Sequence, residues 1–242
     1  MPIIDVDAPA TWPLSIRTKV CGWADSCKGT TNYAQDLMLP TELEEPFCQL
    51  FSGYLVRAYH CTRLMAHEVE MIVTHGLRPL SANLLTERIE AGHGKGLISA
   101  TEAKAFHRAH VFATGEEGGR EGQVCLILSK RQFEYNLEGC LPLLSTWGGE
   151  GIYRSSVAFR IKEKLGRLGS PAVVVARLQL GGDGPRPLMF PSLHKVFVGA
   201  LLGLADTGAD VFYRAPVPPE NIEFVLQPST DAYSRLGDLP LF

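Results

Sequence analysis

The run YLVRAYHCTRL, residues 54–64, constrains the fold of this chain more than any other stretch. Its residues alternate with the period of a strand that has two different faces. One face carries Leu55, Arg57, Tyr59 and Cys61, and the other carries Val56, Ala58, His60 and Thr62. His60 and Thr62 therefore point the same way, next to Arg63, and an amphipathic helix follows. The run is either a site for a small polar ligand or an ordinary core strand with a buried histidine.

The same run resembles the opening of the ADP-ribosyltransferase fold, in which a strand with His-x-Thr precedes a helix that ends in Gly-Leu-x-Pro. The matching segments are Tyr-His-Cys-Thr-Arg at 59–63 and MAHEVEMIVTHGLRPLS at 65–81. This superfamily also includes NAD glycohydrolases and RNA 2′-phosphotransferases, and its histidine and hydroxyl hold the adenosine ribose of NAD. The resemblance therefore implies that His60 and Thr62 bind NAD, with Tyr59 and Arg63 beside them.

The composition is that of a globular protein with a sizeable core. Of the 242 residues, 45% are hydrophobic and 20% are charged, which excludes a disordered chain. With 23 Lys and Arg against 26 Asp and Glu, the net charge of −3 gives no global attraction to nucleic acid or to an anionic membrane. The N-terminus lacks a secretory signal pattern, and the longest apolar run, residues 196–205, is too short to span a bilayer. These features predict a cytoplasmic protein.

The cysteines predict reduced thiols rather than a disulfide framework or a zinc site. The six are scattered through a chain that is large enough to fold without cross-links: Cys21, Cys27, Cys48, Cys61, Cys125 and Cys140. No CxxC pair is present, and the spacings are irregular. We therefore expect no metal. His107 and His110, three residues apart on an expected helix, lack a third ligand nearby.

Two segments divide the chain. Residues 1–52 are rich in Gly, Ser, Thr, Asn and Pro, and predict an irregular N-terminal extension with one short helix near 42–51 that packs on the main domain. Residues 53–242 make up the expected ADP-ribosyltransferase-like, NAD-binding domain. Its fold class is α+β, with a split antiparallel β-sheet flanked by helices over 62–110 and 151–168.

Local signals place several helices and strands in this domain. The first helix ends at Gly76, Ser81 caps the next one, and Ser99 with Glu102 forms a capping box for the third. The runs at 122–129 and 170–180 predict strands, the second of them central. The run at 193–204 fits a strand or a helix equally well. The resemblance also places Phe112 on a strand, where the family has an aromatic residue that stacks on nicotinamide; a core phenylalanine is the alternative.

The segment Trp147-Gly148-Gly149-Glu150 precedes a helix expected over 151–168. The two glycines allow the main chain to approach a ligand, although an acid at a helix start is also a good cap. Trp147 and Tyr153 favour a ligand site, because a cap requires neither.

Cleavage of NAD passes through an oxocarbenium-like transition state, which a carboxylate stabilises. The family places a glutamate at the start of its penultimate strand. Here the matching position is Asp210, in a strand, proline turn, strand pattern over 210–228. Glu150 is the rival acid, longer by one methylene and flanked by glycine, and we rank it somewhat above Asp210.

The resemblance implies an NAD-dependent ADP-ribosyltransferase that releases nicotinamide, of the toxin or defence-effector type. Its partners would be NAD, a macromolecular acceptor (protein or nucleic acid) and an inhibitory protein. The alternatives are an NAD glycohydrolase and a non-catalytic module that binds NAD or ADP-ribose. An enzyme acting on RNA 2′-phosphate is a further alternative, and would need the arginines at 57, 63, 78 and 154 to converge.

Overall fold

The computed structural model describes all residues except 117, 183–185, 206–207, 238 and 240–242. Within the described part the chain is an α+β protein, with twelve α-helices and one seven-stranded sheet. The strands are β1 (Ile3–Ile4), β2 (Leu55–Leu64), β3 (Val124–Ile127), β4 (Ser170–Leu178), β5 (Leu188–Phe190), β6 (Asp210–Tyr213) and β7 (Ile222–Leu226). Their order is β5-β6-β3-β2-β4-β7, and every pair in it is antiparallel. β1 adds a short parallel pair at the beginning of β2.

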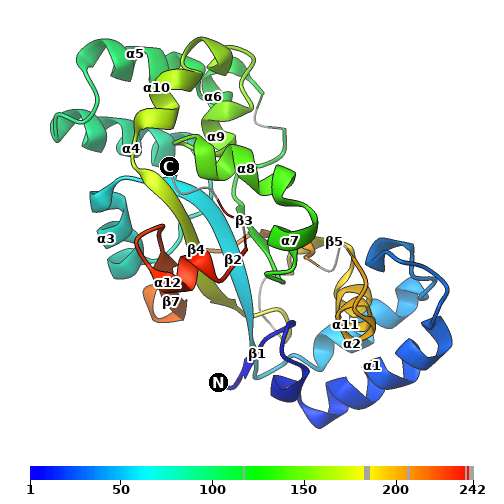
Figure 1. Ribbon diagram of the computed structural model, residues 1–242. Helices are drawn as coiled ribbons and strands as arrows, with labels where there is room; N and C mark the ends of the chain where they lie inside the picture. Colours follow the sequence, from blue (N-terminus) through cyan, green and yellow to red (C-terminus); the bar gives the residue numbers. More distant parts are fainter. Residues whose placement is uncertain (117, 183–185, 206–207, 238, 240–242) are drawn as a thin grey trace.

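The two long strands β2 and β4 form the centre of the sheet (Figure 1). They pair from Val56 opposite Leu178 to Leu64 opposite Ser170. The valine run of β4 is buried on both faces, which confirms the central strand expected from its unbroken apolar sequence. The ending also follows the expected strand, proline turn, strand pattern. The two strands are not neighbours, however, because β6 pairs with β3 and β7 pairs with β4.

Three hydrophobic clusters hold the helices. The largest joins one face of the sheet to α1 (Leu14–Cys27), α2 (Glu44–Gln49) and α11 (Leu193–Leu202), with α3 (Ala66–His75) at its border. The second joins the opposite face to α7 (Gln132–Tyr135), α8 (Leu137–Ser145) and α12 (Asp231–Ser234). The third is a helical layer of α4 (Ala82–Gly94), α5 (Ala100–Ala109), α6 (Val111–Thr114), α9 (Glu150–Tyr153) and α10 (Lys162–Arg167). Figure 1 shows this layer at one end of β2 and β4.

The N-terminal residues are more regular than the sequence suggested. The short helix expected near 42–51 is α2. Residues 14–27, expected as loop, form the long helix α1, which buries Ile16, Val20, Ala24 and Cys27 against α11. These four residues lie four, four and three apart, the spacing of one helix face. Gly22 and the polar residues around it disguised this periodicity.

The expected helix signals are confirmed at several positions. α3 ends at His75 and is capped by Gly76, where an added Cβ would lie 1.9 Å from the Val217 carbonyl oxygen. Ser81 accepts a hydrogen bond from the Leu84 amide at 3.1 Å, so it caps α4. Ser99 and Glu102 form the capping box of α5. The undecided run at 193–204 is helical over α11.

Two expectations are wrong. Phe112 does not lie on a strand, because α5 ends at Ala109 and α6 begins at Val111, with the His110 side chain capping α6 through the Ala113 amide. The helix expected over 151–168 is also interrupted. It divides into α9, a 3-10 turn at Ala158–Arg160 and α10. The Ser155-Ser156-Val157 sequence between them favours this break, since serine competes for backbone hydrogen bonds and valine is stiff in a helix.

Candidate functional site

The edge of β2 that faces β3 is open beyond Tyr59. β4 pairs with β2 as far as Leu64, whereas β3 pairs with it at one position, Tyr59 opposite Ile127. Among the described strands, none pairs with residues 60–64 on this side. The side chains and backbone of this part of β2 therefore border cavities instead of a neighbouring strand.

Three cavities adjoin along this edge. The crevice cavity, of about 100 Å³, lies between β2 and β3 and is lined by residues that include His60, Thr62, Cys125, Gly149 and Glu150. The helix cavity, of about 170 Å³, lies between α3 and α4 and shares His60, Thr62 and Arg88 with the first. The acid cavity, of about 160 Å³, shares Cys125 and Glu150 with the first and adds Tyr59, Arg120 and Asp210. The shared walls connect His60 at one end to Asp210 at the other.

His60 is fixed by a hydrogen bond across the open edge. Its Nδ1 lies 2.8 Å from the backbone oxygen of Cys125. Since a carbonyl oxygen only accepts, Nδ1 carries the proton, and in the neutral ring Nε2 is left as an acceptor. Burial lowers the pKa of His60. A neutral imidazole beside the buried Thr62 hydroxyl can bind a ligand hydroxyl group.

Trp147 does not line these three cavities but contacts Glu68, a residue that lines the helix cavity. It is 1% exposed, and its indole N–H donates to Glu68 Oε2 at 2.8 Å. Glu68 also accepts from the Met65 amide at 2.8 Å and from Arg88 Nε at 2.6 Å. Burial raises the pKa of Glu68, but Arg88 and these hydrogen bonds outweigh it and hold the pKa below its usual value. The network locks the start of α3, α4 and the Trp147 segment together.

Glu150 begins α9 directly after the double glycine. Gly148 and Gly149 have φ of 90° and 52°, and a Cβ on Gly148 would lie 2.4 Å from the Ile152 side chain. The Glu150 carboxylate accepts from Arg120 at 3.2 Å and from Arg154 at 3.3 Å. Its side chain is 17% exposed. Burial, and then the Glu150 charge, raise the pKa of the neighbouring Cys125 thiol to about 12.

Asp210 lies in the same cavity as Glu150. It is the first residue of β6, opposite Ile127 of β3. The residue before it, Ala209, has φ of 46°, a left-handed conformation that is unusual for alanine. Tyr59 lines this cavity too, and burial raises the pKa of its hydroxyl. The two candidate acids, which are 60 positions apart in the sequence, therefore come together.

Three other predicted site residues lie elsewhere. Arg63 donates to the backbone oxygens of Leu168 at 2.8 Å and of Leu144 at 3.3 Å, so its guanidinium supports the fold. Phe112 packs against the helical layer, and Tyr153 lines a separate cavity of about 430 Å³ next to α8 and α10.

The four arginines proposed for an RNA phosphate do not converge. Arg57 pairs with Asp5 and Glu223, Arg78 with Glu87, and Arg154 with Glu150. Arg63, as described above, is held by backbone oxygens. His107 and His110 also have separate partners, since His107 bonds to Glu90 and His110 caps α6. Among the described residues, no group of three His, Cys, Asp or Glu is arranged to hold a metal ion.

Sequence reasoning missed Glu68, Arg88 and Arg120. Glu68 left a usable signal, because an acid at the third position of a helix without a Ser, Thr, Asp or Asn cap often binds the free amides there. Arg88 and Arg120 left none that distinguishes them from surface arginines.

In comparisons with known proteins, no family model, no curated protein and no solved structure matches this chain.

In the part of the chain that the structure describes, no helix combines the length and the apolar character needed to cross a bilayer.

Proposed function

We propose that this chain is an NAD-dependent ADP-ribosyltransferase whose substrate binds along the open edge of β2. In this reaction the bond between the nicotinamide nitrogen and C1′ of the ribose breaks, nicotinamide leaves, and a nucleophile on a macromolecular acceptor attacks C1′. The separation of β2 from β3 beyond Tyr59 supports the ADP-ribosyltransferase-like split sheet of this proposal.

One observation carries the proposal. His60 and Thr62, the pair expected to hold a ribose, share the crevice cavity with Glu150. Glu150 in turn shares the acid cavity with Asp210. His60 and Thr62 would hold the adenosine ribose of NAD, and the acid must face the other ribose, which carries nicotinamide and gains positive charge as the bond breaks. A ribose-binding pair in one cavity and a carboxylate shared with the adjoining one support a ligand that extends along both. Tyr59 lines the acid cavity as well, where it can contact the ligand.

Glu150 is the preferred acid because it borders both the crevice cavity and the acid cavity. Of these two cavities, Asp210 borders only the acid cavity. Arg120 and Arg154 hold its carboxylate in place. An acid held in advance stabilises developing charge without reorganising during the reaction.

The same two arginines favour a second candidate function, a non-catalytic module for NAD or ADP-ribose. Two guanidinium groups on one carboxylate offset its negative charge, which weakens its ability to stabilise an oxocarbenium ion. Such a site would still bind a nucleotide through His60 and Thr62.

Incubation of the purified protein with NAD, followed by measurement of free nicotinamide, tests the proposal. Released nicotinamide with labelled ADP-ribose on a macromolecule supports the transferase. Release without transfer indicates an NAD glycohydrolase. Calorimetry then separates the remaining cases, since NAD binding without release supports the non-catalytic module and no binding refutes both.

A further inference from the structure

The helix cavity contains an unusual concentration of unpaired nitrogen atoms. Among the described residues, six buried side-chain atoms have no hydrogen-bond partner. Three of the six belong to two residues of this one cavity: Arg88 Nη2 and both ring nitrogens of His67. A buried donor without an acceptor is costly, most of all on a charged group, so such atoms are rare unless a ligand or water meets them. Their concentration here indicates a binding site.

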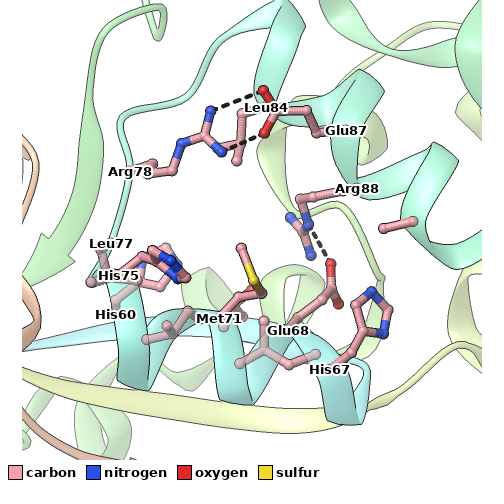
Figure 2. A pocket seen from close by; sticks show the side chains of 15 residues that line it. His60, His67, Glu68, Met71, His75, Leu77, Arg78, Leu84, Glu87 and Arg88 are labelled. Carbon is pink, nitrogen blue, oxygen red and sulfur yellow. Dashed lines mark hydrogen bonds and ion pairs between the residues drawn. The ribbon is translucent and has the colours of Figure 1, made fainter.

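The Arg88 guanidinium is held in a fixed orientation, while its Nη2 has no hydrogen-bond partner. Its Nε donates to Glu68, and its guanidinium carbon lies 5.1 Å from the centre of the Trp147 ring. Figure 2 shows the guanidinium projecting into the space between α3 and α4, with His67 below it and His60 across the cavity. Because the guanidinium is planar and both its salt bridge and the indole fix its orientation, the direction of the free N–H is fixed in advance.

The charges around the cavity leave room for an anion. Its two carboxylates are already bound, Glu68 by Arg88 and Glu87 by Arg78. The remaining polar side-chain groups are Arg88 Nη2, the Thr62 hydroxyl and three imidazoles, those of His60, His67 and His75. Burial is the largest cause of the lowered pKa of His60. The Arg88 charge lowers this pKa further, whereas the Glu150 charge raises it. His60 therefore lies between a cationic side toward Arg88 and an acidic side toward Glu150.

We infer that Arg88 and His67 form a binding site for the phosphate groups of a nucleotide, next to the ribose pair His60 and Thr62. Phosphate oxygens accept from a guanidinium and an imidazole at the same time, and such charge-assisted bonds are among the strongest in proteins. A ribose held by His60 and Thr62 carries its 5′-phosphate within reach of the neighbouring cavity wall. The inference deepens the proposed function and rests on it for the choice of NAD as the natural ligand.

Calorimetric titrations with ADP, inorganic pyrophosphate and adenosine test the site. Wild-type protein should bind ADP more tightly than adenosine, and should bind pyrophosphate weakly. Arg88→Met should weaken ADP binding by roughly ten- to a hundredfold, the value of a hydrogen bond to a charged group, and leave adenosine binding unchanged. His67→Leu should weaken ADP binding by a smaller factor, about three- to tenfold, because an imidazole carries less charge than a guanidinium.

Two further variants keep the test decisive. Arg167→Met is the matched control, since Arg167 is an exposed arginine that pairs with Glu163 away from the cavity, and it should bind ADP as the wild type does. Arg88→Lys covers the case in which Arg88→Met fails to fold by circular dichroism. Lysine keeps the positive charge but lacks the planar set of N–H donors of a guanidinium, so this variant should lose less ADP affinity than Arg88→Met. Equal binding of ADP and adenosine by the wild type, or unchanged ADP binding in Arg88→Met or Arg88→Lys, would overturn the inference.

The outcomes separate this inference from the proposed function. If NAD releases nicotinamide but Arg88→Met leaves the Michaelis constant for NAD unchanged, the phosphate site is refuted and the transferase stands. If nicotinamide is never released but ADP binding depends on Arg88, the phosphate site stands on a protein that is not an NAD-cleaving enzyme.

Discussion

The two candidate acids differ in how their carboxylates are held. Glu150 is fixed by two arginines in a turn that requires glycine, between the ribose pair and the acid cavity. Asp210 follows the strained Ala209 at the beginning of a strand and is exposed to solvent. A preorganised and partly buried acid stabilises charge more strongly than an exposed one, because water screens the latter.

Replacing each acid by its amide separates their roles. Glu150→Gln keeps the shape and removes the charge, so turnover should fall by about 10²-fold or more, the scale of one preorganised electrostatic contact. The Michaelis constant for NAD should change little, because the ribose gains positive charge only as the bond breaks. Asp210→Asn should be nearly silent in turnover. Measured nicotinamide release with the opposite ranking would make Asp210 the acid and Glu150 an anchor for Arg120 and Arg154.

The partly buried His60 makes stability depend on pH. Because burial lowers the pKa of His60 in the folded protein, the unfolded chain binds its proton more readily. The contribution is fully present above the ordinary histidine pKa of about 6.5 and is lost as the pH falls through the folded value. We expect the urea concentration at the midpoint of unfolding to decrease when the pH is lowered from 7.5 to 5.

His60→Gln provides the comparison, since its amide can still donate to the Cys125 carbonyl without titrating. The variant should lose less stability over the same pH range. Some acid sensitivity should remain, because burial also lowers the pKa values of His110 and His194. An identical loss in wild type and variant would show that His60 does not contribute.

At the scale of elements, the sequence predicted those parts whose local signal and tertiary role agree. β2, β4 and the helix ending at Gly76 have clear periodicity and caps, and they form as expected. The strand assigned to Phe112 failed because the assignment came from family order, whereas His110 is a helix cap here. The pairing of Glu68 with Arg88 and Trp147 was not predictable, since it depends on how α3 and α4 pack.

The candidate site shows the same division. His60 and Thr62 were placed together by strand alternation, which is a local rule, and both line the crevice cavity. Glu150, at the start of α9, and Asp210, at the start of β6, line one cavity, and β6 reaches it because β3 joins β2 on one side and β6 on the other. No local pattern encodes that neighbourhood. The sequence therefore offers the two acids as alternatives, whereas the fold places both in one cavity.

The turn before α9 gives a matched pair of glycines. Both have positive φ, so alanine at either is strained by about 1–2 kcal/mol. At Gly148 the new Cβ would also meet Ile152 at 2.4 Å, whereas at Gly149 the nearest atom, on Leu143, is 3.8 Å away. Gly148→Ala should therefore lose roughly 1–3 kcal/mol more in the free energy of unfolding than Gly149→Ala. Urea unfolding measures the difference, and equal losses would mean that the Ile152 contact relaxes.

At the scale of the whole molecule, the residues before 53 share the main core. β1 pairs with the beginning of β2, and α1 packs on α11. The largest hydrophobic cluster includes Ile4 and Ile16 together with Val174 of the central strand. Two-state unfolding is therefore expected to include the N-terminal helix, since its buried residues belong to this main cluster.

Two leucine-sized residues of α1 test this coupling. Ile16 is fully buried, so Ile16→Ala should lower the free energy of unfolding by about 2–5 kcal/mol through lost contacts and an unfilled cavity. Leu14, two residues earlier, is 78% exposed, and Leu14→Ala should change it by less than about 0.5 kcal/mol. Urea unfolding followed by circular dichroism should show one transition, shifted in Ile16→Ala alone. If the main transition stayed in place while a minor helical one moved, α1 would fold apart from the sheet, and residues 1–52 would not share the core of the main domain.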